Sequence, residues 1–274
     1  MTVNEKAYAK INLFLDVTGR RDDGFHDILS VMHSVSLCDE IILTAYASDK
    51  TSIIMTTNIS DLSVGEDNLV YRAVETYLST FGINANVTIH LEKSIPIGAG
   101  LGGGSTDGAA ALRAMNKIFG LAGDDELLVI SGELGSDLPF CLVGGTMICR
   151  GRGEKMTRPG KSPNLIFVIA IGDERVSTPK AYAALDMKYN NFAPASYIPK
   201  LNTDEMYNIF ENVTKNEEIE EIKKLMIKNG AERTLMSGSG PSVFGVFADF
   251  CSASKAKEIL SKNGFTAFVA TSKV

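Results

Sequence analysis

Residues 93–107 read Lys93-Ser94-Ile95-Pro96-Ile97-Gly98-Ala99-Gly100-Leu101-Gly102-Gly103-Gly104-Ser105-Thr106-Asp107. Five glycines are followed by two hydroxyl side chains and a carboxylate, directly before a segment with a helical pattern. Glycine adopts left-handed conformations readily and lets backbone N–H groups approach a ligand closely. A helix that begins near Ser105 would point N–H groups and a partial positive charge of about half a unit at that ligand. The segment therefore predicts a phosphate-binding loop.

The segment after this loop has the pattern of a helix. Apolar residues recur at helical spacing over 112–119, and Gly120 follows as a C-terminal stop. Ser105, Thr106 and Asp107 also suit a helix N-terminus, so capping stays open for Asp107 beside ligand binding.

The type of nucleotide loop is narrowed by what surrounds the glycines. The lysine-hydroxyl pair of a P-loop is missing, which disfavours the scheme of Ras-like proteins and ATPases. Residues 98–103 match G-x-G-x-x-G, the dinucleotide-binding fingerprint, which needs a strand running into the first glycine and an acidic residue about twenty positions on at the end of a second strand. Here Lys93, Ser94 and Pro96 separate the glycines from the preceding strand, and the acidic candidates Asp124 and Asp125 lie where another helix begins. A nicotinamide-dependent oxidoreductase is therefore a minor alternative.

Length and composition indicate a globular protein of two closely packed lobes. The 274 residues are 45% hydrophobic, and no marked linker divides them. A net charge of −6 disfavours nucleic acid as a partner. The longest apolar run, 165–171, is too short to span a membrane and the first residues lack a signal peptide's apolar core, so we expect a cytoplasmic protein. The four cysteines have no C-x-x-C spacing, which indicates neither zinc nor a disulfide framework.

The first half of the chain reads as mixed strand and helix, typical of an α+β lobe. Alternation predicts a long strand over 5–16, on which the pattern alone would place Lys10 facing solvent. The other elements expected here are strands at 40–46, 52–57 and 86–91, helices at 69–81 and 124–134, and extended chain at 139–149.

A turn-rich passage at 150–163 places the lobe boundary, which gives lobes of 1–158 and 159–274. Residues 236–242 form a second glycine loop, either a tight turn or a ligand contact. The elements expected in the second lobe are strands at 164–171, 234–236, 243–247 and 265–270, and helices at 179–185, 217–228 and 253–262.

Three segments together resemble the three motifs of the GHMP kinases. They are Ala7-Tyr8-Ala9-Lys10-Ile11-Asn12-Leu13, Pro96 to Asp107, and Ser237-Gly238-Ser239-Gly240-Pro241-Ser242. Two further segments resemble the branch of that superfamily that acts on a cytidine-diphosphate-linked alcohol. They are Gly24-Phe25-His26-Asp27 and Gly135-Ser136-Asp137-Leu138-Pro139-Phe140. The similarity covers essentially the whole chain in the expected order.

The resemblance implies a two-lobe α+β fold with the active site in the cleft between the lobes. The N-terminal lobe would be like a small-subunit ribosomal protein and the C-terminal lobe ferredoxin-like. It also implies ATP-dependent phosphorylation of a hydroxyl on the erythritol part of the cytidyl substrate, with ATP and Mg²⁺ as cofactors and without nucleic acid or membrane partners. Such a transfer needs an in-line acceptor and nearby cations more than covalent chemistry.

Two residues resemble the catalytic pair of the family. Asp137 would accept the proton of the acceptor hydroxyl, and Lys10 would keep Asp137 ionised and help neutralise the developing phosphoryl charge. From the residues alone, Asp137 reads as a turn-former before Pro139. The resemblance implies that the two side chains lie within a few ångströms of each other.

The resemblance also assigns substrate contacts. Phe25 and His26 look like the base-recognition pair, and Tyr182 like the second aromatic ring that sandwiches the cytosine, with Thr178 as a further substrate contact. Stacking on such rings contributes about 1–3 kcal/mol per base. Asn12 shares the face of Lys10 and is expected at the diphosphate end of the substrate.

The implied nucleotide contacts are Asn68, Lys93, Pro96, Gly98, Gly100, Leu101, Gly102, Gly103, Gly104, Ser105 and Thr106. For Asn68, an alternative explains the segment Glu66-Asp67-Asn68-Leu69 almost as well: Asp67 or Asn68 would cap the following helix. Ser105 is also the expected protein ligand of Mg²⁺. Thr106 and Gly108 stand where many relatives carry Ser and Ala, and a glycine here weakens a helix by roughly 1 kcal/mol relative to alanine.

Two other functions stay open. One is a GHMP kinase for a different alcohol, such as homoserine or a mevalonate derivative, against which Phe25, His26 and Tyr182 argue. The other is a nucleotide-binding regulator that has lost catalysis, against which the presence of both Lys10 and Asp137 argues.

Overall fold

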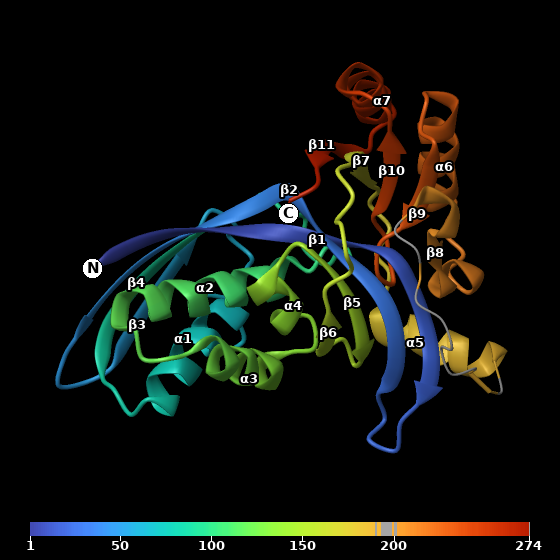
Figure 1. The fold of residues 1–274 in the computed structure, drawn as a ribbon. Coiled ribbons are helices and arrows are strands. Elements are labelled where there is room, and N and C mark those ends of the chain that lie inside the picture. The colour runs from blue at the N-terminus through green and yellow to red at the C-terminus, as the bar shows by residue number, and fades with distance from the viewer. Residues whose placement is uncertain (190, 193–198, 200–201, 274) are drawn as a thin grey trace. The chain divides into compact units, whose positions relative to one another are not determined.

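Two long strands begin the chain, β1 (Thr2–Arg20) and β2 (His26–Ala47), and they are neighbours in one sheet (Figure 1). The structure is a computed structural model, and it describes residues 1–189, 191–192, 199 and 202–273. The strands expected at 5–16 and 40–46 are confirmed as parts of β1 and β2. The first half of β2 was not predicted, because residues 28–35 are buried without interruption and Ser30, His33 and Ser34 break any apolar alternation.

The chain clusters into two compact units, and β1 and β2 pass from one into the other. Unit 1 comprises Met1–Ala9, Cys38–Ile97 and Gly102–Val143; unit 2 comprises Lys10–Leu37, Gly98–Leu101 and Gly144–Val274. The lobe boundary expected at 158/159 stays a prediction.

In unit 1, helices pack against strands around one core. Strand β4 (Ala85–Glu92) pairs in parallel with β3 (Ser52–Thr57) and antiparallel with Glu40–Ala47 of β2. Side chains of these strands share the core with α1 (Leu69–Thr80), α2 (Gly103–Phe119) and α3 (Asp124–Leu134) (Figure 1). All of these predicted elements are confirmed.

Helix α2 begins two residues earlier than predicted. The N-cap is Gly102, in a left-handed conformation, and its carbonyl accepts a hydrogen bond from the Thr106 N–H at 2.8 Å. No side chain caps this end, so the first N–H groups of the helix have neither an intrahelical partner nor a cap. Gly120 ends the helix in a left-handed conformation, as predicted.

The extended chain expected at 139–149 is wrong in its first half. Residues Leu138–Val143 form a short helix, α4, and only then does strand β5 (Thr146–Gly151) begin. Proline is tolerated in the first turn of a helix, where its missing N–H has no intrahelical partner. Leu138 and Phe140 are buried where α4 packs on α2 and α3, so tertiary packing stabilises a helix too short to show a periodicity.

Unit 2 contains a four-stranded antiparallel sheet. Its strand order is β11 (Thr266–Thr271), β7 (Ile166–Ile171), β10 (Val243–Phe247) and β9 (Arg233–Met236), and α6 (Glu217–Lys228) and α7 (Phe250–Lys262) pack on it (Figure 1). These strands and helices, like α5 (Thr178–Lys188), lie where the sequence predicts them, within a few residues at their ends.

The remaining strands of unit 2 pair beside β1 and β2 in the first sheet. Strand β5 pairs antiparallel with residues 28–33 of β2 and continues into β6 (Lys155–Thr157), while β8 (Tyr207–Asn208) pairs in parallel with β1. The short 3-10 helices η1 (Thr203–Glu205) and η2 (Ile209–Asn212) flank β8. Among the residues that the structure describes, no helix is long and apolar enough to cross a bilayer. The cytoplasmic location stays a prediction.

A buried histidine links three segments of unit 2. His33 has no exposed surface, and its ring nitrogens bond the hydroxyls of Thr146 at 2.7 Å and Ser272 at 2.8 Å. Burial lowers the pKa of His33 from 6.5 to about 4, because the charged ring would lose its hydration. His33 is therefore neutral in the folded protein over most of the physiological range.

The pKa of His33 predicts a loss of stability in mild acid. The unfolded chain binds a proton at His33 below about pH 6.5, and the folded chain does so only below about pH 4. The contribution of neutral His33 to the free energy of unfolding is therefore complete above pH 6.5 and is lost as the pH falls from 6.5 to 4. The free energy of unfolding should fall by about 1.4 kcal/mol per pH unit from this residue in that window. His33→Gln, which is uncharged, should show a shallower fall in urea unfolding at about pH 6 and about pH 5. Parallel curves for the two proteins would contradict the assignment.

Candidate functional site

The lysine of the first motif is buried, which the strand pattern alone did not predict. Lys10 is 5% exposed and Asn12 1% exposed, because this part of β1 is covered on both faces. The Lys10 ammonium donates a hydrogen bond to Asn12 Oδ1 at 2.9 Å. A lysine held this way in the interior is costly unless its charge has partners, which makes it a candidate for function.

Asn12 joins the first motif to the third. Its Oδ1 also accepts from the Gly238 N–H at 3.0 Å, and its Nδ2 donates to Ser30 Oγ at 2.8 Å. The Ser30 hydroxyl in turn donates to the Phe14 carbonyl at 2.8 Å. The amide of Asn12 is therefore oriented from both ends.

The glycine-rich motif meets the same network in unit 2. The Leu101 carbonyl accepts from the Lys10 N–H at 2.9 Å, and the Gly100 carbonyl from Ser237 Oγ at 3.0 Å. Gly100 has a φ of +76°, and a Cβ there would lie 2.4 Å from the Ser237 carbonyl oxygen. Only glycine fits so close to the Ser237 carbonyl. Because Gly100 and Leu101 bond both other motifs, all three motifs meet at Gly98–Leu101.

The second glycine loop is both a tight turn and a packing partner of the first. The Gly240 N–H donates to the Ser237 carbonyl at 3.0 Å, which closes the turn. Asn208, which no motif singled out, donates from Nδ2 to the carbonyls of Met236 and Gly238, each at 2.7 Å. Thr178, a predicted substrate contact, reaches this loop, with its hydroxyl 2.7 Å from that of Ser239.

A buried cluster of charges in unit 1 lies under the start of α2. The Lys93 ammonium bonds Asp39 Oδ2 and, at 2.7 Å, Asp107 Oδ2, and all three side chains are at most 5% exposed. Asp39 Oδ1 accepts from the N–H groups of Ser94 at 2.6 Å and Ile95 at 2.7 Å. The cluster therefore fixes the end of β4, the start of the glycine-rich segment and the first turns of α2. Asp39 carries no local sequence signal and was missed.

Asp107 is part of this cluster and not a cap. Burial raises the pKa of Asp107 well above its ordinary value, Lys93 opposes that effect, and the nearby charge of Asp39 adds to it. Its Oδ1 is buried and has no hydrogen-bond partner among the described residues. The capping interpretation is wrong, because the N-cap position belongs to Gly102.

Other predicted nucleotide contacts have structural partners within unit 1. Thr106 is buried and its hydroxyl donates to the Tyr8 carbonyl at 2.7 Å. Asn68 caps α1 by accepting from the Val70 N–H at 2.9 Å, as the capping alternative predicted. Gly108 lies where a Cβ would be 3.2 Å from Leu138 Cδ2 and 3.3 Å from the Leu69 carbonyl oxygen. The close packing of α1 and α4 explains glycine at a position where helix propensity favours alanine.

Asp137 lies directly before α4. It is half-buried, and its carbonyl accepts from the Cys141 N–H at 3.0 Å. Asp137 belongs to unit 1 and Lys10 to unit 2. The expected approach of the two side chains stays a prediction, as do the roles of the other predicted site residues.

The predicted base-recognition residues gather in unit 2. The rings of His26 and Tyr182 stack with centroids 4.7 Å apart and 25° between their planes. Phe25 is 48% exposed, and the guanidinium carbon of Arg152 lies 3.9 Å from its ring centroid. His26 Nε2 lies 2.8 Å from Asp186 Oδ1. Arg152 and Asp186 were not among the predicted site residues.

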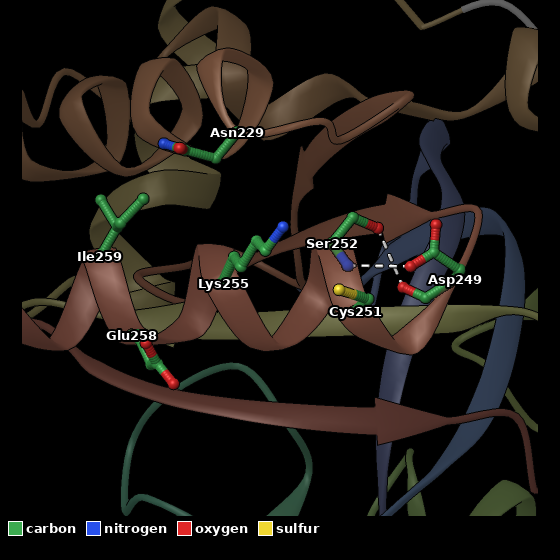
Figure 2. A pocket seen from close by; sticks show the side chains of 7 residues that line it. All are labelled: Asn229, Asp249, Cys251, Ser252, Lys255, Glu258 and Ile259. Atoms are coloured by element: carbon green, nitrogen blue, oxygen red, sulfur yellow. Dashed lines mark hydrogen bonds between the residues drawn. The ribbon is translucent and has the colours of Figure 1, made fainter.

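A surface hollow of about 510 Å³ lies elsewhere in unit 2, beside α7 (Figure 2). Its lining residues are Asn229, Asp249, Cys251, Ser252, Lys255, Glu258 and Ile259. Asp249 is occupied as the N-cap of α7, accepting from the Ser252 N–H at 2.9 Å. None of the predicted site residues lines this hollow, so it takes no part in the site described above.

Known proteins match this chain over almost its full length. Residues 68–145 match the GHMP kinases N terminal domain and residues 200–266 the GHMP kinases C terminal domain. A 4-diphosphocytidyl-2-C-methyl-D-erythritol kinase of Caldicellulosiruptor saccharolyticus is 43% identical over 93% of this chain and 91% of its own length. One from Clostridium acetobutylicum is 39% identical over 92% of this chain and 94% of its own.

Solved structures of GHMP kinases are also similar to this chain. A 4-(cytidine 5'-diphospho)-2C-methyl-D-erythritol kinase superposes with a TM-score of 0.82 and 31% identity, over 99% of this chain and all of that one. A homoserine kinase from Cytophaga hutchinsonii has a TM-score of 0.74 at 21% identity, over 100% of this chain and 95% of that one, which shows a shared fold.

The charge cluster predicts that one lysine contributes far more to stability than another. Lys93→Met would leave two buried carboxylates without their cation and should lower the free energy of unfolding by about 3–5 kcal/mol. Lys117→Met is the matched control: its ammonium lies 2.5 Å from Glu5 Oε1 but is 60% exposed, so the loss should be at most about 1 kcal/mol. Urea unfolding at neutral pH measures both. Equal losses would show that the buried cluster does not hold unit 1 together.

Proposed function

We propose that this chain transfers the γ-phosphoryl group of ATP to the 2-hydroxyl of 4-diphosphocytidyl-2-C-methyl-D-erythritol, called the cytidyl alcohol below. The chain belongs to the family of kinases named for this alcohol, within the GHMP kinases. The observation that carries the proposal is that the three motifs contact one another: Asn12 joins the first motif to the third, and Gly100 and Leu101 of the second motif accept from Ser237 and Lys10. Such contacts would be expected where the three motifs build one site.

The glycine-rich segment and the first turn of α2 are the proposed site for the ATP phosphates. Uncapped N–H groups at Gly103, Gly104 and Ser105 suit phosphate oxygens, and the helix dipole favours their negative charge. The proposed contacts of the rest of the nucleotide are Asn68, Lys93, Pro96, Gly98, Gly100, Leu101, Gly102 and Thr106. Lys93 would contact the nucleotide from its place in the cluster with Asp39 and Asp107, and the same cluster holds the helix start in place.

The residues present fit a magnesium ion held mainly by the nucleotide. Mg²⁺ prefers oxygen ligands, keeps several waters and usually binds through substrate phosphates. The described residues hold no group of three or more acidic, histidine or cysteine side chains that could bind a metal ion, but Ser105 offers a hydroxyl in the first turn of α2. Bound there, the ion would supply positive charge to the triphosphate, with Ser105 as its protein ligand.

Asp137 and Lys10 are the proposed catalytic pair. Asp137 would accept the proton of the acceptor hydroxyl as that oxygen approaches the γ-phosphorus. Lys10, which Asn12 orients, would keep Asp137 ionised and stabilise the negative charge of the transferring group. Asn12 itself would contact the diphosphate end of the substrate.

The cytidine part of the substrate would bind at Phe25, His26 and Tyr182. Phe25 presents an exposed ring to one face of the base, and Tyr182 would offer the second face. His26 would read the edge of the base by hydrogen bonding. Thr178, at the start of the helix that carries Tyr182, would contact the substrate as well.

Removing either catalytic side chain should reduce turnover strongly. Asp137→Ala and Lys10→Ala should each lower kcat by about a hundredfold or more in a coupled ADP-release assay with the cytidyl alcohol. The double variant should be little worse than either single one, because residues that act as a unit are not additive. Undiminished turnover in a single variant would refute its role, and additive losses would refute the pair. Stoichiometric ATP binding by the wild type without turnover would favour a regulator instead.

The base site should be sensitive to Phe25. Phe25→Ala should raise KM for the cytidyl alcohol by about tenfold or more through lost stacking, with kcat nearly unchanged. Phe250→Ala is the matched control, because Phe250 is also exposed, at 57%, but lies on α7. If no free cytidine nucleotide competes with the substrate, a kinase for another alcohol becomes the better assignment.

A further inference from the structure

We infer that Asp186 is a positioning residue that makes the base site select cytosine over uracil, by fixing which nitrogen of His26 carries the proton. The inference rests on the proposed function, because it takes His26 to read the edge of the base. Asp186 lies outside the three motifs, on α5, and contacts His26.

The contact is specific and well shielded. Asp186 Oδ1 lies 2.8 Å from His26 Nε2, and the exposed fractions of the two side chains are 20% and 7%. The other carboxylate oxygen, Oδ2, faces Arg20 at 3.5 Å, and the Arg20 side chain is 67% exposed. One oxygen is thus directed to the histidine while the other faces a solvated cation.

Helix α5 supplies two of the groups that contact the His26 ring, and Phe192 packs edge-on against the same ring with centroids 5.8 Å apart. Tyr182 and Asp186 are four residues apart, so they lie on the same face of the helix. Tyr182 stacks on the ring and Asp186 bonds its edge, so one fixes the plane of the imidazole and the other its rotation within that plane. A side chain held in both respects presents its remaining nitrogen in one direction.

The carboxylate decides the tautomer. An ionised carboxylate only accepts hydrogen bonds, whereas a neutral imidazole has one N–H donor and one lone-pair acceptor. Nε2 must therefore carry the proton toward Asp186, and Nδ1 is left as an acceptor. Among the described residues no hydrogen bond to Nδ1 is found, and in the proposed site this acceptor would face the base.

An acceptor distinguishes the two pyrimidines. Cytosine presents a 4-amino donor where uracil presents a carbonyl acceptor. Nδ1 would accept from the cytosine amino group and would face the lone pairs of the uracil oxygen. A buried polar group left without its partner discriminates strongly between otherwise similar ligands.

The test measures binding of CDP and UDP to wild type and to Asp186→Asn by calorimetry. An asparagine is nearly isosteric but can either donate or accept, so it no longer enforces one tautomer. The preference for CDP over UDP should fall by about tenfold, mainly through weaker CDP binding. Phe25→Ala is the matched control: it should weaken both nucleotides by similar factors and leave their ratio unchanged, because every base has a face to stack.

A double-mutant cycle shows whether Asp186 acts through His26. In a His26→Gln background, Asp186→Asn should change the CDP to UDP ratio no further. Nitrogen NMR of the wild type should show the neutral ring protonated at Nε2, a readout that does not depend on the variant folding. With the cytidyl alcohol, Asp186→Asn should raise KM and leave kcat within about twofold.

Several results would overturn the inference: a ring protonated at Nδ1, an unchanged ratio in Asp186→Asn, or an equal effect of that change when His26 is absent. Loss of turnover at an unchanged KM would overturn it as well. Failure of the wild type to phosphorylate the cytidyl alcohol, with the CDP preference and its dependence on Asp186 intact, would refute the proposed reaction and leave the base site standing.

Discussion

One buried ammonium shared between two carboxylates organises unit 1. Lys93 follows strand β4, Asp39 lies in β2, and Asp107 lies in α2, so their contacts bind three elements at the point where the glycine-rich segment begins. Removing such charges from water is expensive, and only their mutual contacts and the N–H groups of Ser94 and Ile95 offset that cost. The cluster holds the start of α2 in place, as the phosphate site proposed there would require before its ligand arrives.

In unit 2, a side-chain amide and backbone groups hold the motifs together around the Lys10 ammonium. Asn12 bonds Lys10, Gly238 and Ser30, and Gly100 packs so closely on Ser237 that a side chain would not fit. Backbone carbonyls and amides from distant parts of the sequence are thereby fixed with little room to move. The two units use different chemistry for one requirement, because positioning contributes most of what a kinase needs from its protein.

The base-recognition residues illustrate a second layer of positioning. In the proposed base site, His26 could bond a base in two opposite ways, and the neighbouring carboxylate and the stacked ring would leave it one. Helix α5 carries both of these neighbours one turn apart. In the proposed site, Asp186 would act on specificity through His26 without touching the substrate.

The sequence by itself determined the family motifs, the long strand β1, the helix after the glycines and most elements of the second half, because these depend on local periodicity and on glycine or proline at fixed positions. Tertiary structure alone decided that Lys10 is buried, that residues 138–143 are helical and that the first half of β2 is a strand. It also decided that Asp39 contacts Lys93, that Asn208 contacts the second glycine loop and that Asp186 contacts His26. Each of these depends on partners far away along the chain. Burial on both faces removes the alternation that marks a strand, and a polar residue acquires its role only from the group that folding places opposite it.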